Sequence, residues 1–167
     1  MKKFRISERD IALNGIIAAL YAVITFIGSP IAYGAIQFRI AEILVLLCFW
    51  NRKLAIGLVV GCLIANAISP LGLLDVFFGT LATLIACLGI IFCKHLIVAI
   101  LFPVLANAFI VAAELTTLGE PYWLSVLTVG AGELAVMVVA YIIYMILKRK
   151  QGFFTLIRAT RNLNFKF

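Results

Sequence analysis

The chain has 167 residues, of which 65% are hydrophobic and only 13% are charged. Because so few polar residues cannot cover the surface of a folded domain, this composition excludes a water-soluble protein and indicates that the lipid bilayer is its solvent. The net charge of +7 would also suit a nucleic-acid partner. Cations at membrane borders are more simply explained by topology and anionic lipid headgroups, so we expect no nucleic-acid partner.

The predicted elements follow from cutting the sequence at charge clusters and at Pro and Gly turn signals. Several of the resulting runs approach the ~20 residues that a helix needs to cross a bilayer, and 38–51 and 54–69 are short. We expect an all-α membrane protein: one six-helix bundle over residues 1–167, with a basic segment 1–9 and a basic tail 148–167. Residues 151–167 fit either a short helix on the inner leaflet or a frayed basic end. The predicted spans are 10–28, 38–51, 54–69, 75–93, 95–114 and 123–147.

The positive charges predict the orientation. With an even number of spans both termini lie on one side, and all of the 14 Lys and Arg residues except Arg39 then fall on that side. By the positive-inside rule this side is cytoplasmic, so we expect a multi-pass cell-membrane protein with both termini inside. The inner cations are Lys2, Lys3, Arg5, Arg9, Arg52, Lys53, Lys94, Lys148, Arg149, Lys150, Arg158, Arg161 and Lys166.

Acidic residues inside spans point to a binding site. An ionisable group there costs about 2.5–3.5 kcal/mol, so each one needs a partner, a ligand or a water-filled path. Glu8 and Asp10 lie at the inner edge, where a solvated helix start explains them. The other acids are expected in the outer half: Glu42, Asp75, Glu114, Glu120 and Glu133.

Helix geometry allows several outer polar groups to meet. Glu133 lies about 15 Å into its helix, and Asn107 lies about 10 Å below Glu114 on a shared helix face. We expect these groups to line one cavity that opens outward. The polar residues assigned to it are Arg39, Glu42, Asn66, Asp75, Asn107, Glu114 and Glu133.

Structural roles compete with ligand binding at some of these positions. Arg39 and Glu42 also fit an i, i+3 ion pair at a helix end. Asp75 also fits the N-cap of the fourth helix. Glu133 is the hardest to explain structurally, because Arg39 is the only cation expected in the outer half.

Other residues near the outer border also allow two interpretations. Asn66 and Asn107 suit interhelical hydrogen bonds as well as a ligand. Glu120 is expected to be a solvated loop charge. Tyr33 and Trp123 can stack on a flat ligand ring or belong to an interfacial aromatic belt.

The excess of carboxylates over cations indicates the kind of ligand. One cation among several acids leaves a site that favours a cationic ligand or one rich in N–H donors, since an acidic ligand would leave the carboxylates unpaired. The sequence has no ATP-binding loop, no HExxH and no nucleophile beside a base, so we expect no enzyme and no cofactor. Its 4 Cys residues lack CxxC spacing and predict no metal site.

Small residues on the first helix form two small-xxx-small pairs, Gly15/Ala19 and Ala18/Ala22. Such a face permits close helix approach, either within the bundle or to another protein. We expect it to be a partner-docking face.

Three segments carry a family resemblance: NGIIAALY at 14–21, IQFRIAE at 36–42 and SPLGLLDVFFGTLAT at 69–83. Together with the six-span pattern they resemble the substrate-binding S components of energy-coupling-factor (ECF) transporters, and more narrowly the QueT family of queuosine-precursor transporters. The similarity extends over nearly the whole chain. Gly15 departs from the AxxxA pattern of the first helix, which would have Ala there.

The resemblance implies a high-affinity binding protein for a 7-deazaguanine such as pre-queuosine 1. It would dock onto a transmembrane T component driven by two ATPase subunits, with no cofactor of its own. In this hypothesis Glu133 or Glu42 reads the guanine edge, and Asp75 or Glu114 meets the ammonium. Asn66 and Asn107 take the remaining polar atoms. Arg39 orients Glu42 or caps the carbonyl.

Two other classes remain open. A stand-alone secondary carrier for a cationic or purine-like metabolite would also need carboxylates in the membrane, although inverted repeats, which such carriers typically show, are not evident. A non-transporting membrane scaffold would bind no small molecule.

Overall fold

The computed structural model describes residues 6–32 and 38–160. Within these ranges every regular element is a helix, which confirms the predicted all-α class. The elements are α1 (Glu8–Ala32), the 3₁₀ helices η1 (Ile40–Phe49) and η2 (Arg52–Leu54), α2 (Ala55–Ala67), α3 (Leu73–Phe92), α4 (Leu96–Ala99), α5 (Leu101–Thr117), α6 (Tyr122–Leu147) and α7 (Gln151–Leu156).

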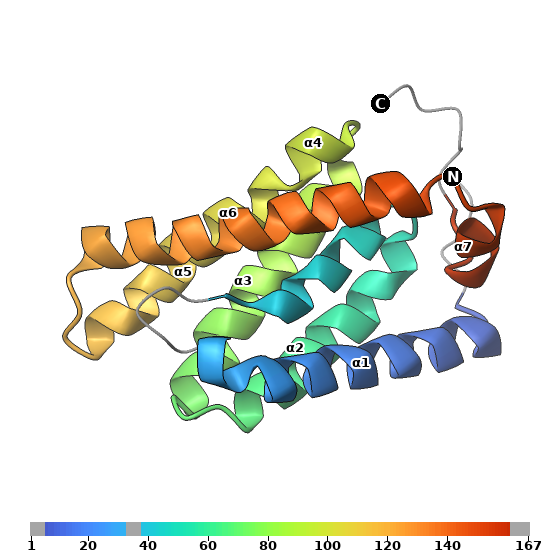
Figure 1. The fold of residues 1–167 in the computed structure, drawn as a ribbon. Coiled ribbons are helices and arrows are strands. Elements are labelled where there is room, and N and C mark those ends of the chain that lie inside the picture. The colour runs from blue at the N-terminus through green and yellow to red at the C-terminus, as the bar shows by residue number, and fades with distance from the viewer. Residues whose placement is uncertain (1–5, 33–37, 161–167) are drawn as a thin grey trace.

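The long helices run side by side around η1 (Figure 1). α1 packs on α2, α2 on α3, α3 on α5 and α5 on α6, while η1 contacts α1, α2, α3 and α6. Val45 and Leu46 of η1 have no exposed surface. The segment predicted as the second span is therefore a core element enclosed by the other helices.

Among the described residues, four helices are long and apolar enough to cross a membrane: Glu8–Ser29, Leu73–Phe92, Leu96–Thr117 and Tyr122–Leu147. The third combines α4 and α5, which are separated at Ile100, three residues before Pro103. Proline has no N–H and its ring crowds the carbonyl four residues earlier, so the helix is interrupted there. The predicted six-span count is not confirmed, because η1 and α2 are only 10 and 13 residues long.

The 3₁₀ form makes η1 longer than an α-helix with the same number of residues. At about 2.0 Å per residue its ten residues cover about 20 Å, against about 15 Å for an α-helix. Its first turn carries Glu42 and it is followed by Trp50 and Asn51. This short apolar run therefore links an acidic residue in the bundle to the basic end of the molecule.

Glycines of α2 allow α1 to pack unusually close. A Cβ at Gly57 would lie 2.5 Å from the backbone oxygen of Asn14, and one at Gly61 would lie 2.7 Å from that of Ala18. The Asn14 side chain also accepts a hydrogen bond of 2.6 Å from the amide of Gly57, which lies in the first turn of α2. Close α1–α2 packing therefore uses Asn14 and Ala18.

The two small-residue pairs of α1 differ in exposure. Ala18 is 7% exposed and lies against Gly61. Gly15 and Ala19 are exposed, and a Cβ at Gly15 would meet nothing within 4 Å. The 15/19 pair therefore lies on the outer surface of the bundle.

Ala22, the second member of the 18/22 pair, lies at the seam between α1 and the end of α2. It is half-buried and, together with Thr25, Ala65 and Pro70, lines a small cavity there. Residues four apart share a helix face, and this face of α1 is turned toward α2 by Ala18. Ala18 therefore packs within the bundle, and the docking role predicted for Ala18 and Ala22 stays a prediction.

Asp10 joins three segments at the basic end of the bundle. Lys53 donates to its Oδ2 at 2.6 Å, and Arg158 donates to its Oδ1 at 2.6 Å. Asp10 is 2% exposed, so its interpretation as a solvated helix-start charge was wrong. The sequence could not show this, since Lys53 and Arg158 are brought to it only by the fold.

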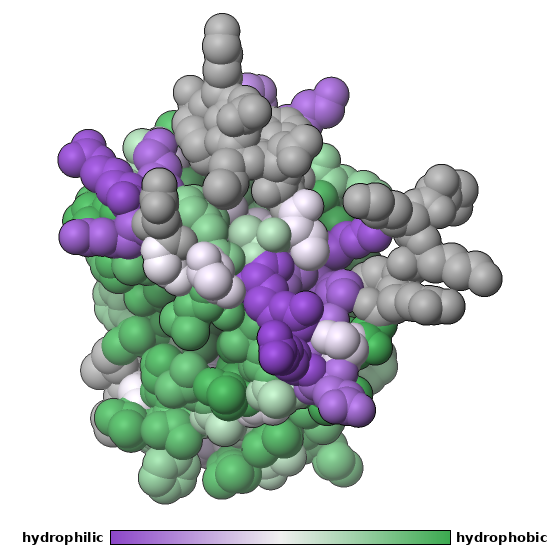
Figure 2. Space-filling model, turned by 90° about the vertical axis from the view of Figure 1, so that its right-hand side faces the viewer, coloured by the Kyte–Doolittle hydropathy of each residue, from purple (hydrophilic) through white to green (hydrophobic). Residues whose placement is uncertain are grey.

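The chain after α7 is tied to the same end. Asn51 donates to the carbonyls of Ile157 and Arg158, and Thr160 donates its amide to the Trp50 carbonyl. Phe153 of α7 lies edge-on to Trp50, with ring centroids 5.9 Å apart. Figure 2 views this end, where hydrophilic side chains gather beside the hydrophobic flanks. The predicted tail helix exists as α7, while residues 161–167 lie outside the described part.

Gly57→Ala is expected to destabilise the protein by about 1–3 kcal/mol, because the added methyl meets backbone atoms of Asn14 that cannot move independently. Thermal unfolding of the purified protein in detergent measures the effect. Gly15→Ala is the matched control: its methyl enters open space, and alanine is the better helix former. Equal melting temperatures for the two variants would contradict the close packing.

Asp10→Asn is expected to lower the melting temperature and to expose the chain around Arg158 to trypsin. The substitution removes the charge that holds Lys53 and Arg158. Glu8→Gln, two residues earlier and exposed, serves as the control. If the two variants are cleaved at the same rate, Asp10 does not hold the C-terminal segment in place.

Candidate functional site

The fold buries most of the predicted polar residues. Glu42, Asp75, Asn107 and Glu114 have no exposed surface, Glu133 is 1% exposed and Asn66 is 3% exposed. They come from η1, α2, α3, α5 and α6. Burial of this many carboxylates and amides among apolar helices is costly unless bound groups satisfy them.

Arg39 forms an ion pair with Asp75, with 3.0 Å between Nη2 and Oδ1. The alternative of an Arg39–Glu42 ion pair is not what the structure contains, because the guanidinium turns toward α3. The alternative of Asp75 as an N-cap is also wrong: the N-cap of α3 is Gly72, and Asp75 lies in the first helical turn. Gly72 has a φ of 60°, a conformation that side-chain-bearing residues rarely adopt.

Gly79 makes room for this ion pair. A Cβ at Gly79 would lie 2.6 Å from Asp75 Oδ1, 2.6 Å from Asn66 Nδ2 and 3.1 Å from Arg39 Nη1. Asn66 in turn donates to Thr80 Oγ1 at 3.3 Å, an interhelical bond between α2 and α3. Arg39, Asn66 and Asp75 therefore meet at one point on α3 that only glycine leaves open.

Glu42 is held by two hydroxyl groups that the sequence analysis did not select. Tyr21 of α1 donates to its Oε1 at 2.5 Å, and Thr83 of α3 donates to the same oxygen at 2.9 Å. Cys62 of α2 lies 3.2 Å from the Thr83 hydroxyl. One sequence signal was available, because Asn14, Tyr21 and Thr25 recur on one face of the first helix.

The buried acceptors are incompletely paired. In the described part of the chain, six buried oxygens have no hydrogen-bond donor: Glu42 Oε2, Asp75 Oδ2, Asn107 Oδ1, Glu114 Oε1, Glu114 Oε2 and Glu133 Oε1. The charges of Asp75 and Arg39 act on Glu114, and those of Glu42 and Arg39 act on Glu133. The orphaned carboxylate oxygens therefore belong to one electrostatically connected cluster around Arg39, rather than to separate defects.

The side chain of Asn107 makes one hydrogen bond and leaves its oxygen unpaired. Its Nδ2 donates to the Pro103 carbonyl at 3.1 Å, so its bond is within its own helix rather than between helices. Its Oδ1 remains without a donor among the described residues. Asn107 and Glu114, seven residues apart on α5, both lie buried, as their shared helix face predicted.

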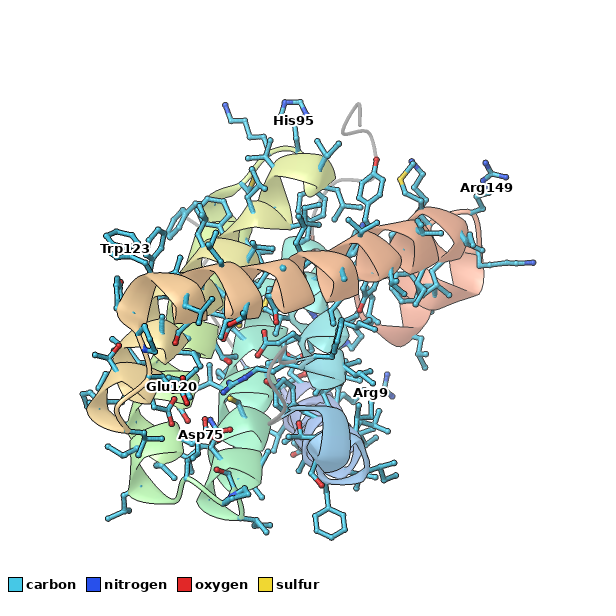
Figure 3. The ribbon with its side chains drawn as sticks, turned by 60° about the vertical axis from the view of Figure 1, so that its left-hand side comes forward. Arg9, Asp75, His95, Glu120, Trp123 and Arg149 are labelled. Carbon is cyan, nitrogen blue, oxygen red and sulfur yellow. The ribbon has the colours of Figure 1, made fainter. Side chains whose placement is uncertain are left out.

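Trp123 and Glu120 lie at the surface, unlike the buried polar residues of the cluster. Trp123 is 70% exposed and projects away from the bundle, whereas Asp75 lies among the helices (Figure 3). The Trp123 ring packs edge-on to that of Tyr122, with ring centroids 5.2 Å apart. Glu120 is exposed, as expected for a solvated loop charge. Tyr33 lies outside the described residues, so its predicted stacking role stays a prediction.

Fold and buried cluster together define a class: an α-helical, multi-pass membrane protein with a candidate site for a small polar ligand inside the bundle. A model of the QueT transporter family matches residues 11–149, and the chain belongs to this family. The predicted family resemblance is thereby confirmed.

A curated relative supports the assignment. The queuosine precursor transporter QueT of Lactococcus lactis subsp. cremoris (strain MG1363) is 42% identical over 78 residues, and the alignment spans 46% of this chain and 46% of the relative. The chain thus matches about half the length of that protein. No solved structure matches this chain.

Arg39→Met is expected to destabilise the protein by about 3–5 kcal/mol, because Asp75 would keep a buried charge without its cation. The double variant Arg39→Met/Asp75→Leu should recover much of this loss, since it removes both charges. Chemical or thermal unfolding in detergent gives the values. Arg149→Met, at an exposed cation, is the control; a double variant no more stable than Arg39→Met would argue against the pair.

Proposed function

We propose that the protein is the substrate-binding S component of an ECF importer and that it binds a 7-deazaguanine, pre-queuosine 1 in particular. The observation that carries the proposal is the set of six buried oxygens, on four carboxylates and one amide, that have no donor among the described residues. A ligand rich in N–H groups supplies what these oxygens lack. Membership of the QueT transporter family supports this ligand class.

The charge of the cluster fits the ligand. Among the described residues, four buried acids against Arg39 leave an excess of negative charge, which a ligand with an ammonium arm reduces. Hydrogen bonds to ionised groups are worth about 1.5–3 kcal/mol each, so a few of them give tight binding. An anionic ligand would instead meet like charges in a medium where their repulsion is poorly screened.

The basic end of the bundle is assigned to the cytoplasm and the acidic cluster to the outer half. Arg9 and Arg149 lie toward one end of the molecule, and Asp75, Glu120 and Trp123 toward the other (Figure 3). The positive-inside rule assigns the end that is rich in Lys and Arg to the cytoplasm. The ligand would then enter from outside and leave inward, with ATP hydrolysed by two partner subunits.

The partner-docking face is assigned to the exposed pair Gly15 and Ala19 of α1. A partner helix could approach closely there, because both residues are small. The 18/22 pair is less suited to docking than the 15/19 pair, because Ala18 packs on α2 and Ala22 is half-buried at the same seam. A transmembrane T component is the proposed partner. The exposed apolar residues that flank the 15/19 pair are Ile16, Leu20 and Val23.

Pre-queuosine 1 should bind the purified protein in isothermal titration calorimetry, and Glu133→Gln should weaken binding by about 10- to 100-fold. The substitution keeps the size of the side chain but replaces an acceptor oxygen with a donor. Glu120→Gln, at an exposed loop acid, should bind like the unaltered protein.

Absence of binding by the unaltered protein would reject the proposed ligand. Proteoliposomes holding this protein alone should accumulate no ligand, because the proposal assigns ATP hydrolysis to partner subunits and the sequence has no ATP-binding loop. Uptake by the protein alone would instead identify a stand-alone carrier.

A further inference from the structure

The buried carboxylates form two levels along α3. Asp75 lies in its first turn and Thr83, the donor to Glu42, lies eight residues further on, about 12 Å along the helix axis. The outer level holds Asp75, paired with Arg39, and Glu114, which lies in the last turn of α5, the helix packed on α3. The inner level holds Glu42, which accepts from Thr83, and Glu133, which lies about 16 Å along α6 from Tyr122.

The two levels differ in which carboxylate oxygens are open, that is, have no hydrogen-bond donor among the described residues. At the inner level, Oε1 of Glu42 already accepts from Tyr21 and Thr83, so only Oε2 is open to a ligand. At Glu133, Oε1 has no donor among the described residues and is likewise open to a ligand. The inner level therefore offers one open acceptor on each of two carboxylates, which suits two neighbouring N–H donors.

The outer level combines acceptors with the site's cation. Asp75 has one oxygen on Arg39 and the other open, while both oxygens of Glu114 are open. Three open acceptors match an ammonium group, which has three N–H donors and no acceptor. Arg39 lies in the same level and can donate to a carbonyl oxygen beside that ammonium.

We propose, resting on the function proposed above, that the deazaguanine binds with its aminopyrimidine edge inward and its aminomethyl arm outward. Glu133 Oε1 accepts from the amino group, and Glu42 Oε2 accepts from the ring N–H. Glu114 and Asp75 Oδ2 take the ammonium, and Arg39 donates to the ring carbonyl. Glu42 is thus not the bidentate reader of the base.

The arrangement of groups on the base agrees with this orientation. In the base, the carbonyl and the arm lie on the same side and the amino group lies on the other. Among the described residues the site is arranged in the same way: Arg39 forms its ion pair with Asp75 of the outer level, whereas neither Glu42 nor Glu133 forms an ion pair.

The test measures the affinity of each of three ligands for the unaltered protein and for each variant by isothermal titration calorimetry. The ligands are pre-queuosine 1, 7-deazaguanine, which lacks the arm, and the 7-aminomethyl-7-deazahypoxanthine analogue, which lacks the amino group. For the unaltered protein, each deletion should weaken binding by about 10-fold or more. Glu114→Gln should abolish the arm's contribution and keep that of the amino group, and Glu133→Gln should do the reverse.

Each other outcome has a defined meaning. The orientation is overturned if Glu114→Gln abolishes the contribution of the amino group and Glu133→Gln that of the arm. It is also overturned if both variants keep both contributions. Either result leaves the proposed function standing. Failure of the unaltered protein to bind any of the three ligands overturns both. Glu120→Gln is the control for surface charge, and Glu114→Leu replaces Glu114→Gln if that variant does not yield folded protein.

Discussion

The imbalance between buried acids and buried cations is the constraint on which the rest of this molecule depends. Arg39 is paired with Asp75, while Glu42, Glu114 and Glu133 form no ion pair in the described part of the chain. Leaving buried acceptors unpaired costs free energy. A bundle that tolerates this cost must be held together by its apolar packing, and the site is then prepared for a ligand that supplies the missing donors.

The helices that provide this packing also set the shape of the site. η1 lies at the centre, and its 3₁₀ form carries Glu42 from the acidic region toward the basic end in ten residues. α3 contributes to both levels of the site, through Asp75 and Thr83. Gly79 lets the Arg39–Asp75 pair lie directly against α3, and Gly61 lets α1 bring Tyr21 within reach of Glu42. Small residues thus position the charged ones.

Much of the candidate site was predictable from the sequence, because an acid within an apolar run is rare and expensive. Glu42, Asp75, Glu114 and Glu133 stand out on that ground alone, and all four are buried. Tyr21 and Thr83 did not stand out, since a tyrosine or threonine in a membrane helix is cheap and common. The partner of Arg39 was not predictable either: Glu42 is near in sequence, but Asp75, 36 residues away, makes the contact.

Composition and periodicity by themselves determined the all-α membrane class, the separation of basic from acidic regions and the identity of the buried acids. These features are local, because hydropathy and charge act residue by residue on transfer into lipid. Only the tertiary structure decided which oxygens are already bonded, that Asp10 is buried beside Lys53 and Arg158, and that η1 is enclosed rather than exposed to lipid. Each of those depends on contacts between segments distant in sequence, which spacing along the chain does not specify.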